Sequence, residues 1–184
     1  GGPVVRAAPV PSGLTLGGFE THAAMGDRGV RGLGDYAGRE QIDAAGRYVI
    51  PGFIDAHLHL ESSKLLVDEF ARLVLPLGTT TVVADPHEIA NVLGTDGVHW
   101  LLDFCADLPL DVYFMASSCV PASSFESPRR ALNDGDLEGL LRRRRVLGLA
   151  EMMNFPGVIA GAESELSEIG RQGAPPVGGQ GPGG

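Results

Sequence analysis

The sequence has few cations, few cysteines and no long apolar run. Its 184 residues contain 14 Lys and Arg against 23 Asp and Glu, which gives a formal net charge of −9. A nucleic-acid backbone is neutralised by clustered Lys and Arg, so this charge balance argues against DNA or RNA as a partner. A small or neutral substrate is the more compatible kind of ligand.

The two cysteines and the apolar segments bear on the cellular compartment. Cys105 and Cys119 have no spacing typical of a disulfide framework or a thiolate metal site, and we interpret them as small buried apolar side chains in a reducing compartment. No apolar run approaches the roughly 18 residues of a membrane span, and no basic segment precedes an apolar signal core. We therefore expect a cytoplasmic protein with no membrane partner.

Composition divides the chain into three regions. Residues 1–47 are rich in Gly, Pro and Ala without sustained periodicity, and we expect them to be poorly ordered. Residues 161–184 lose all pattern and end in a segment dominated by Gly and Pro, which predicts a disordered tail. In between, strand patterns at residues 48–57, 79–84, 111–116 and 146–151 alternate with helix patterns at 65–77, 89–105 and 137–143.

Repeated strand–helix units with apolar strands predict an α/β fold in which helices cover a parallel sheet. The chain is too short for a complete eight-stranded α/β barrel, which typically has about 250 residues. If the four strands are consecutive, their C-terminal ends lie along one rim, where the active sites of such folds are found.

His57 and His59 stand at the end of the first predicted strand. Strand alternation would send both imidazoles out of one face, where two ring nitrogens can hold one metal ion. Such a pair also arises by chance on a half-exposed strand, so the spacing alone leaves both readings open. The preceding Pro-Gly turn and the polar residues that follow, beginning with Glu61, favour an active-site loop.

Further polar residues end the later strands. Glu151 ends an otherwise apolar strand, where a carboxylate must be paired, hydrated or bound to a metal ion. A structural salt bridge and a functional role therefore remain alternatives for it. After the second strand, Asp85 is expected to orient the loop while Pro86 fixes its backbone. His99 is expected to pack within its helix.

The run of four arginines at residues 142–145 lies at the end of the third predicted helix. Cations complement the negative end of a helix dipole and remain hydrated there. We therefore expect these side chains to stay in solvent and to have no anion-binding role.

Three stretches carry a family resemblance. Residues 46–63 contain Pro-Gly-Phe-Ile-Asp-Ala-His-Leu-His, residues 78–92 contain Asp-Pro-His-Glu-Ile-Ala-Asn-Val, and residues 148–158 contain Ala-Glu-Met-Met-Asn-Phe-Pro-Gly-Val. Together they closely resemble the bacterial adenine deaminases of the amidohydrolase superfamily. The first pattern is shared across that superfamily, and the other two are specific to adenine deaminases. The resemblance covers about residues 35–160 and corresponds to the N-terminal portion of the family.

The resemblance implies a partial (β/α)8 TIM-type barrel of about four βα units over residues 48–160, with a remnant of the small N-terminal β domain in residues 1–47. His57 and His59 would bind the first ion of a binuclear metal centre, and Glu151 would bridge both ions. Mn or Fe is the expected divalent metal, with Zn as an alternative. Further catalytic candidates within the family motifs are Glu61, His87 and Glu88.

The implied reaction converts adenine and water to hypoxanthine and ammonia, through attack of a metal-activated hydroxide on C6. The sequence also departs from the family. Further histidine ligands and a catalytic aspartate of later barrel strands are missing, and Gln180 stands where a similar family segment has a metal-binding histidine. We therefore expect a truncated chain that is inactive alone and able to pair with another copy through open sheet edges. The alternatives are another amidohydrolase acting on a cyclic amide and a non-catalytic metal-binding remnant.

Overall fold

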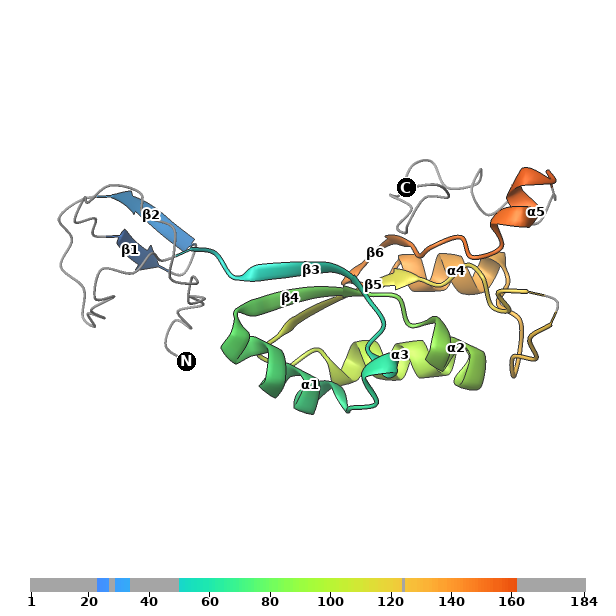
Figure 1. The fold of residues 1–184 in the computed structure, drawn as a ribbon, viewed down its shortest axis with the longest axis horizontal. Helices are drawn as coiled ribbons and strands as arrows, with labels where there is room; N and C mark the ends of the chain where they lie inside the picture. The colour runs from blue at the N-terminus through green and yellow to red at the C-terminus, as the bar shows by residue number, and fades with distance from the viewer. Residues whose placement is uncertain (1–22, 27–28, 34–49, 124, 162–184) are drawn as a thin grey trace.

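The computed structural model describes residues 23–26, 29–33, 50–123 and 125–161 (Figure 1). The predictions for the 162–184 tail, including Gln180, and for most of residues 1–47 lie outside these ranges. Within the N-terminal region, β1 (Ala23–Gly26) and β2 (Gly29–Leu33) form an antiparallel pair. A small β element therefore precedes the main sheet, whereas the predicted domain boundaries stay predictions.

Four parallel strands form the main sheet. They are β3 (Phe53–Leu58), β4 (Thr79–Ala84), β5 (Asp111–Ala116) and β6 (Val146–Leu149), paired in the order β3-β4-β5-β6. Each strand is parallel to its neighbour, and the spatial order follows the chain order. This arrangement confirms the predicted α/β class and is consistent with a segment of a TIM-type barrel.

Helices connect the strands and cover the sheet (Figure 1). The helices are α1 (Val67–Val74), α2 (His87–Leu93), α3 (Thr95–Phe104), α4 (Asp134–Leu141) and α5 (Phe155–Ile159), with short 3₁₀ turns η1 (Glu61–Ser63) and η2 (Leu75–Leu77). Their buried apolar side chains pack with those of β4 and β5. Representative members of this core are Ala71, Val82, Leu101, Val112, Phe114 and Leu140. Among the described helices, none combines the length and apolarity that a bilayer crossing requires.

The prediction of one helix over residues 89–105 is wrong, because the chain forms two helices there. Gly94 separates α2 from α3 with φ 66° and ψ −154°, a backbone conformation outside the helical region. A Cβ on Gly97 would lie 2.8 Å from Cβ of Leu93 and 2.9 Å from Cγ1 of Ile89. The two helices therefore fold back closely on one another, and a small residue at Gly97 permits the approach.

The prediction that all four arginines of the 142–145 run stay in solvent is also wrong. An Nη of Arg143 lies 2.5 Å from Asp103 Oδ1, and its other Nη donates to Nδ1 of His99 at 2.8 Å. Arg145 donates to the carbonyl of Val112 at 3.3 Å. These contacts tie the α4–β6 connection to α3 and β5, so half of the run has a structural role.

Candidate metal centre

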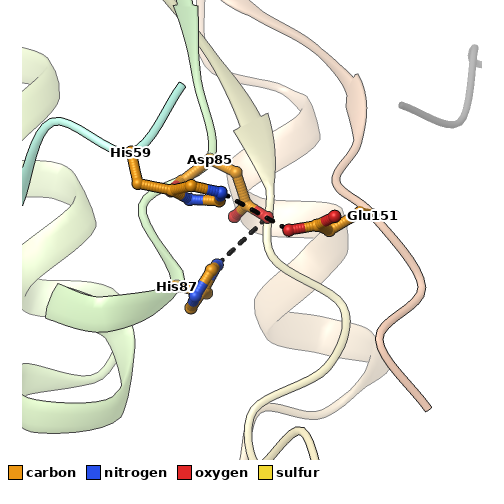
Figure 2. A group of neighbouring side chains, drawn as sticks. All are labelled: His59, Asp85, His87 and Glu151. Carbon is orange, nitrogen blue, oxygen red and sulfur yellow. Dashed lines mark hydrogen bonds and ion pairs between the residues drawn. The ribbon is translucent and has the colours of Figure 1, made fainter. Parts of the chain in front are cut away.

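The carboxyl ends of the strands gather the candidate residues (Figure 2). His57 lies in β3 and His59 directly follows it, Asp85 directly follows β4, and Glu151 lies two residues beyond the end of β6. In a parallel sheet these ends share one edge of the fold, which is where α/β enzymes build their active sites. The rim predicted from the strand pattern is therefore present.

His57, His59 and Glu151 converge although their strands occupy opposite edges of the sheet. Nε2 of His57 lies 3.8 Å from Oε1 of Glu151, and Nε2 of His59 lies 3.5 Å from the same oxygen. The two imidazole rings are 5.1 Å apart between centroids and nearly perpendicular. Both nitrogens therefore lie near a single carboxylate oxygen.

The ring of His59 is oriented by the backbone. Its Nδ1 lies 3.1 Å from the carbonyl oxygen of Asp85. A carbonyl only accepts, so Nδ1 carries the hydrogen of this contact, and Nε2 is the ring nitrogen that faces Glu151. Metal-bound histidines are oriented in this way, by a hydrogen bond from the ring nitrogen that does not bind the metal.

Asp85 places a carboxylate in the interior beside this pair. It is 2 % exposed, Ser117 Oγ donates to its Oδ1 at 2.7 Å, and its Oδ2 lies 3.2 Å from Nδ1 of His87. The hydrogen bond to Asp85 raises the pKa of His87 above its usual value, although burial of the ring acts in the opposite direction.

Four of these side chains form a compact donor set. One ligand atom from each of His59, Asp85, His87 and Glu151 lies within 4.8 Å of every other. Donors bound to one ion at about 2.1 Å are separated by roughly 3–4 Å, so a modest contraction would close the set around a metal ion. Two imidazoles and two carboxylates suit Zn, Fe or Mn. The residues present therefore fit a divalent metal.

From the sequence we expected Asp85 only to orient its loop. We did not identify it as a candidate metal ligand. The available signal was its position immediately after the buried end of β4, the place that drew attention to Glu151 on β6. Asp85 does also orient a neighbour, because its carbonyl fixes His59.

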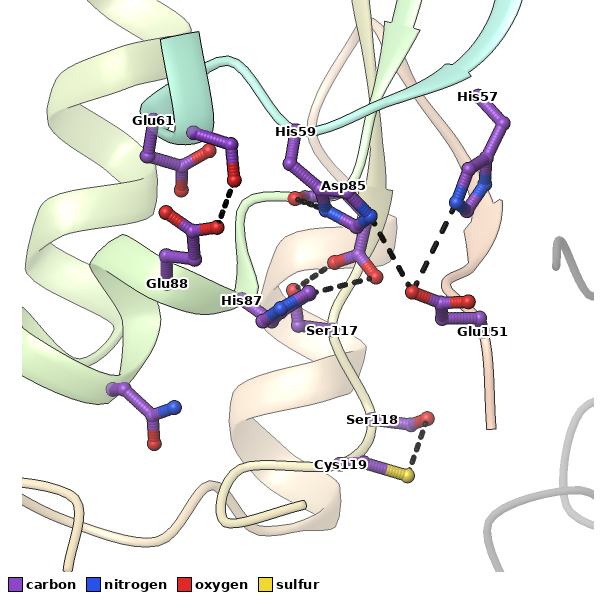
Figure 3. A network of polar contacts seen from close by, with 12 residues as sticks. His57, His59, Glu61, Asp85, His87, Glu88, Ser117, Ser118, Cys119 and Glu151 are labelled. Atoms are coloured by element: carbon purple, nitrogen blue, oxygen red, sulfur yellow. Dashed lines mark hydrogen bonds and ion pairs between the residues drawn. The ribbon is translucent and has the colours of Figure 1, made fainter. Parts of the chain in front are cut away.

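Glu61 and Glu88 lie beside one another, away from Glu151 (Figure 3). Oε1 of Glu61 accepts from the backbone N–H of Ile89 at 3.1 Å, and the hydroxyl of Ser62 donates to Glu88. Burial raises the pKa of Glu61, and the nearby charge of Glu88 acts in the same direction, whereas the N–H of Ile89 opposes it. Glu61 is thus bound to the start of α2, Glu88 on α2 is bound to η1, and both stand outside the four-residue set.

The two cysteines are free and buried, in agreement with their interpretation as small apolar side chains. Sγ of Cys119 lies 3.1 Å from Sδ of Met152 and 3.7 Å from the hydroxyl of Ser118. Ser118 and Cys119 lie in the loop after β5, and Figure 3 shows them below the metal-binding candidates.

A family model and individual known proteins both match this chain. Residues 48–169 match the model of the amidohydrolase family. The adenine deaminase of Clostridium acetobutylicum is 51% identical over 138 residues, which cover 75% of this chain and 24% of that protein. Adenine deaminase 1 of Rhizobium meliloti is 54% identical over 137 residues, or 74% of this chain and 24% of that protein.

An archaeal relative gives a longer match. The adenine deaminase of Archaeoglobus fulgidus is 49% identical over 151 residues, covering 82% of this chain and 27% of that protein. The chain thus spans about a quarter of the length of the curated relatives that it matches.

Proposed function

The chain belongs to the amidohydrolase family, and from this premise we propose that it carries the first part of an adenine deaminase active site. The reaction would convert adenine and water to hypoxanthine and ammonia. The observation that carries this proposal is the convergence of His57, His59 and Glu151 at the carboxyl ends of β3 and β6, in a chain about half identical to proteins named adenine deaminase.

His57, His59 and Glu151 are the proposed metal ligands, with Mn or Fe as the expected ion and Zn as the alternative. Glu151 is the proposed bridging carboxylate. Nε2 of His59 and Oε1 of Glu151 lie 3.5 Å apart, so each could give a lone pair to a cation bound between them. A metal ion held by these residues would supply the positive charge that lowers the pKa of bound water.

The remaining roles belong to the side chains around this set. Asp85 holds His59 in its orientation through the backbone carbonyl. We propose that His87, Glu61 and Glu88 line the approach for the substrate. Glu61 and Glu88 would accept hydrogen bonds from N–H groups of the purine, since a carboxylate can accept from an amine or a ring N–H.

A chimera tests the proposed function. Residues 50–161 would replace the aligned segment of the Clostridium acetobutylicum adenine deaminase, and hypoxanthine formation would be followed with added Mn²⁺. We expect adenine deamination that Glu151→Gln abolishes, and a cyclic amide such as dihydroorotate to be left unchanged. A chimera that folds and hydrolyses the cyclic amide but not adenine would instead favour the alternative amidohydrolase reading.

We propose that these 184 residues do not turn over adenine by themselves. The sequence has five histidines, and of these only His57, His59 and His87 belong to the described rim. His99 lies on α3 and pairs with Arg143. A complete binuclear centre of the implied kind needs further histidine ligands and an aspartate. Robust hypoxanthine formation by the purified chain with Mn²⁺ or Fe²⁺ would contradict this proposal.

We also propose self-association through the edges of the sheet. Three apolar side chains on the edge strands are exposed to about half or more of their area, Phe53 at 47%, Ile54 at 65% and Leu147 at 44%. An open apolar edge is a template for pairing with another chain. Analytical ultracentrifugation should show dimers or larger species that Ile54→Lys weakens.

The proposed compartment is the cytoplasm, a choice supported by the free thiols of Cys105 and Cys119.

A further inference from the structure

We propose that Sγ of Cys119 and Sδ of Met152 form a site for one soft monovalent cation, Cu⁺. The two sulfurs lie 3.1 Å apart and come from the loops that follow β5 and β6. This sulfur site is separate from the nitrogen and oxygen donors of the candidate metal centre, and its ligands are of a different chemical class. Its occupancy does not depend on the proposed reaction.

The contact between the two sulfurs is directional. The thiol of Cys119 donates toward Sδ of Met152, and the hydroxyl of Ser118 lies 3.7 Å from the same thiol sulfur (Figure 3). A thioether is a weak acceptor of hydrogen bonds, whereas thiolate and thioether together are the ligands that Cu⁺ prefers. A cation in place of the thiol hydrogen would therefore be held by both sulfurs.

Burial and charge favour a monovalent ion at this position. Cys119 is 5 % exposed and its neighbour Ser118 is 4 % exposed, so an uncompensated charge there would be costly. On binding, the thiol releases its proton to solvent, the sulfur becomes a thiolate, and the ion remains Cu⁺. Thiolate, thioether and ion then carry no net charge, whereas a divalent ion on the same two ligands would leave one positive charge in the interior.

A small movement of Met152 makes room for the ion. Metal–sulfur bonds of about 2.3 Å hold the two sulfurs of a bent site roughly 4 Å apart, so the pair has to open by about 1 Å. Methionine has a flexible, unbranched side chain that adapts to such changes. Met152 is also half-buried while Cys119 is buried, so an ion reaches the pair from the side of Met152.

Cys105 provides the contrast within the same chain. Its thiol is fully buried among the apolar side chains of the main core, and burial raises its pKa to about 12. The thiolate is the form that binds a metal ion, so a thiol that keeps its proton so firmly is a poor ligand. Cys119 lies outside that core, in the loop after β5, with a second sulfur in contact.

A bound ion would join two loops at the carboxyl ends of the strands. Met152 directly follows Glu151 in the chain. Cu⁺ held by Cys119 and Met152 would therefore restrict the backbone beside Glu151 without using its carboxylate as a ligand.

The test uses the full 184-residue chain, reduced and free of oxygen, in competition with a chromophoric Cu⁺ chelator. We expect one Cu⁺ per chain, a loss of affinity of about tenfold or more for Met152→Leu, and a larger loss for Cys119→Ala. Cys105→Ala and Met153→Leu are the matched controls and should bind as the parent does. Glu151→Gln should also bind as the parent does, because its carboxylate is not a ligand of this site.

Two further measurements keep the outcome decisive. Circular dichroism establishes that each variant is folded. X-ray absorption at the copper edge reads the ligands of the parent chain without any substitution and should show two sulfur neighbours, so it decides if Cys119→Ala does not fold.

Nitrogen or oxygen neighbours in place of the two sulfurs would overturn this inference, as would absence of Cu⁺ binding by the parent chain. It would also fall if folded Met152→Leu kept the parent affinity, or if Cys105→Ala lost as much as Cys119→Ala. Failure of the adenine deaminase chimera would refute the proposed reaction and leave the sulfur site untouched, because Cu⁺ binding is measured without turnover.

Discussion

Nε2 of His59 lies 3.5 Å from Oε1 of Glu151, although β3 and β6 are the two outer strands of the main sheet. Three steps of about 4.8 Å would separate these strands by roughly 14 Å in a flat sheet, with side chains standing perpendicular to it. The contact therefore requires the sheet to curl, as a segment of a barrel does. Curvature of the backbone is what assembles the donor set.

Replacing the carboxylate at the centre of this contact should remove stabilisation by metal. In the parent chain, Co²⁺ at 100 times its dissociation constant should stabilise the fold by about 2.7 kcal/mol and raise the melting temperature by several degrees. Glu151→Gln removes the charged oxygen that faces both His57 and His59, so its melting temperature should not respond to Co²⁺. Differential scanning fluorimetry measures the shift.

The exposed Glu138 on α4 offers a matched carboxylate control for Glu151. Glu138→Gln should keep the full response to Co²⁺, because that side chain is 68% exposed and pairs only with Arg142 among its described contacts. An equal Co²⁺ shift in Glu151→Gln and the parent would remove Glu151 from the ligand set.

Two glycine-to-alanine variants should change stability in opposite directions. A Cβ on Gly52 would overlap the side chain of Thr80 on β4, so Gly52→Ala should force β3 and β4 apart locally and cost about 1–3 kcal/mol. Gly139 lies within α4, and a Cβ added there would meet no atom within 4 Å, so Gly139→Ala should stabilise the chain by about 1 kcal/mol. Urea unfolding gives both values.

A second variant tests whether crowding between Gly52 and the side chain of Thr80 causes the loss of stability. Thr80→Gly removes the overlapping atoms, so Gly52→Ala should cost much less in that background than in the parent. An unchanged cost would show that conformational preference at Gly52, and not crowding, is responsible.

The alternation of strand and helix patterns predicted the order of the main elements correctly, because burial on both faces leaves near-continuous apolar strands. It failed where one residue sets a local geometry. The pattern on both sides of Gly94 is helical and continuous, and only the φ of 66° at that glycine divides α2 from α3. The spacing of apolar residues predicts which face of a helix is buried, but it does not predict the backbone φ of a single residue.

Only part of the candidate site could be identified from the sequence. His57, His59 and Glu151 follow from strand ends, since a polar side chain after a buried strand is visible in the sequence. The burial of Asp85 and its hydrogen bond from Ser117 arise only when β4 and β5 pack together. Contacts across strands are set by sheet curvature, and no local pattern encodes them.

The start of α4 should be sensitive to its N-cap. The side chain of Asn133 accepts from the backbone N–H of Gly135 and Asp136, while Asp136 accepts in return from the N–H of Asn133. Asn133→Ala leaves these donors to solvent and should cost about 1 kcal/mol in urea unfolding. Asn133→Asp keeps the acceptor and should retain most of the stability. A loss of similar size in Asn133→Asp would point to the amide itself.

Acid should weaken the same helix start. The hydrogen bond from Arg130 lowers the pKa of Asp136 below its usual 3.8. Because the folded state binds this proton less readily than the unfolded state, the contribution is present above about pH 4 and is lost as the pH falls further. Asp136→Asn should therefore lower stability at pH 7 and reduce the slope between pH 5 and 3. Parallel stability curves for the parent and Asp136→Asn would contradict the pairing with Arg130.

Alkali should destabilise the core through Cys105. Burial raises the pKa of this thiol from 9.0 to about 12, and the charge of Arg145 offsets only part of the effect. The unfolded chain loses the Cys105 proton near pH 9 while the folded chain keeps it, so stability falls as the pH rises from about 9 toward 12.

Cys105→Ala should isolate that effect. At pH 7 the variant should be less stable by about 1 kcal/mol, because the fully buried sulfur leaves a small cavity. The deficit should shrink steadily between pH 8 and 10.5, as the parent loses stability that the variant does not. Val98→Ala, a nearby core truncation on α3 without a titrating group, should show a constant deficit over the same range. A constant deficit for Cys105→Ala as well would mean that the buried thiol does not retain its proton in the folded chain.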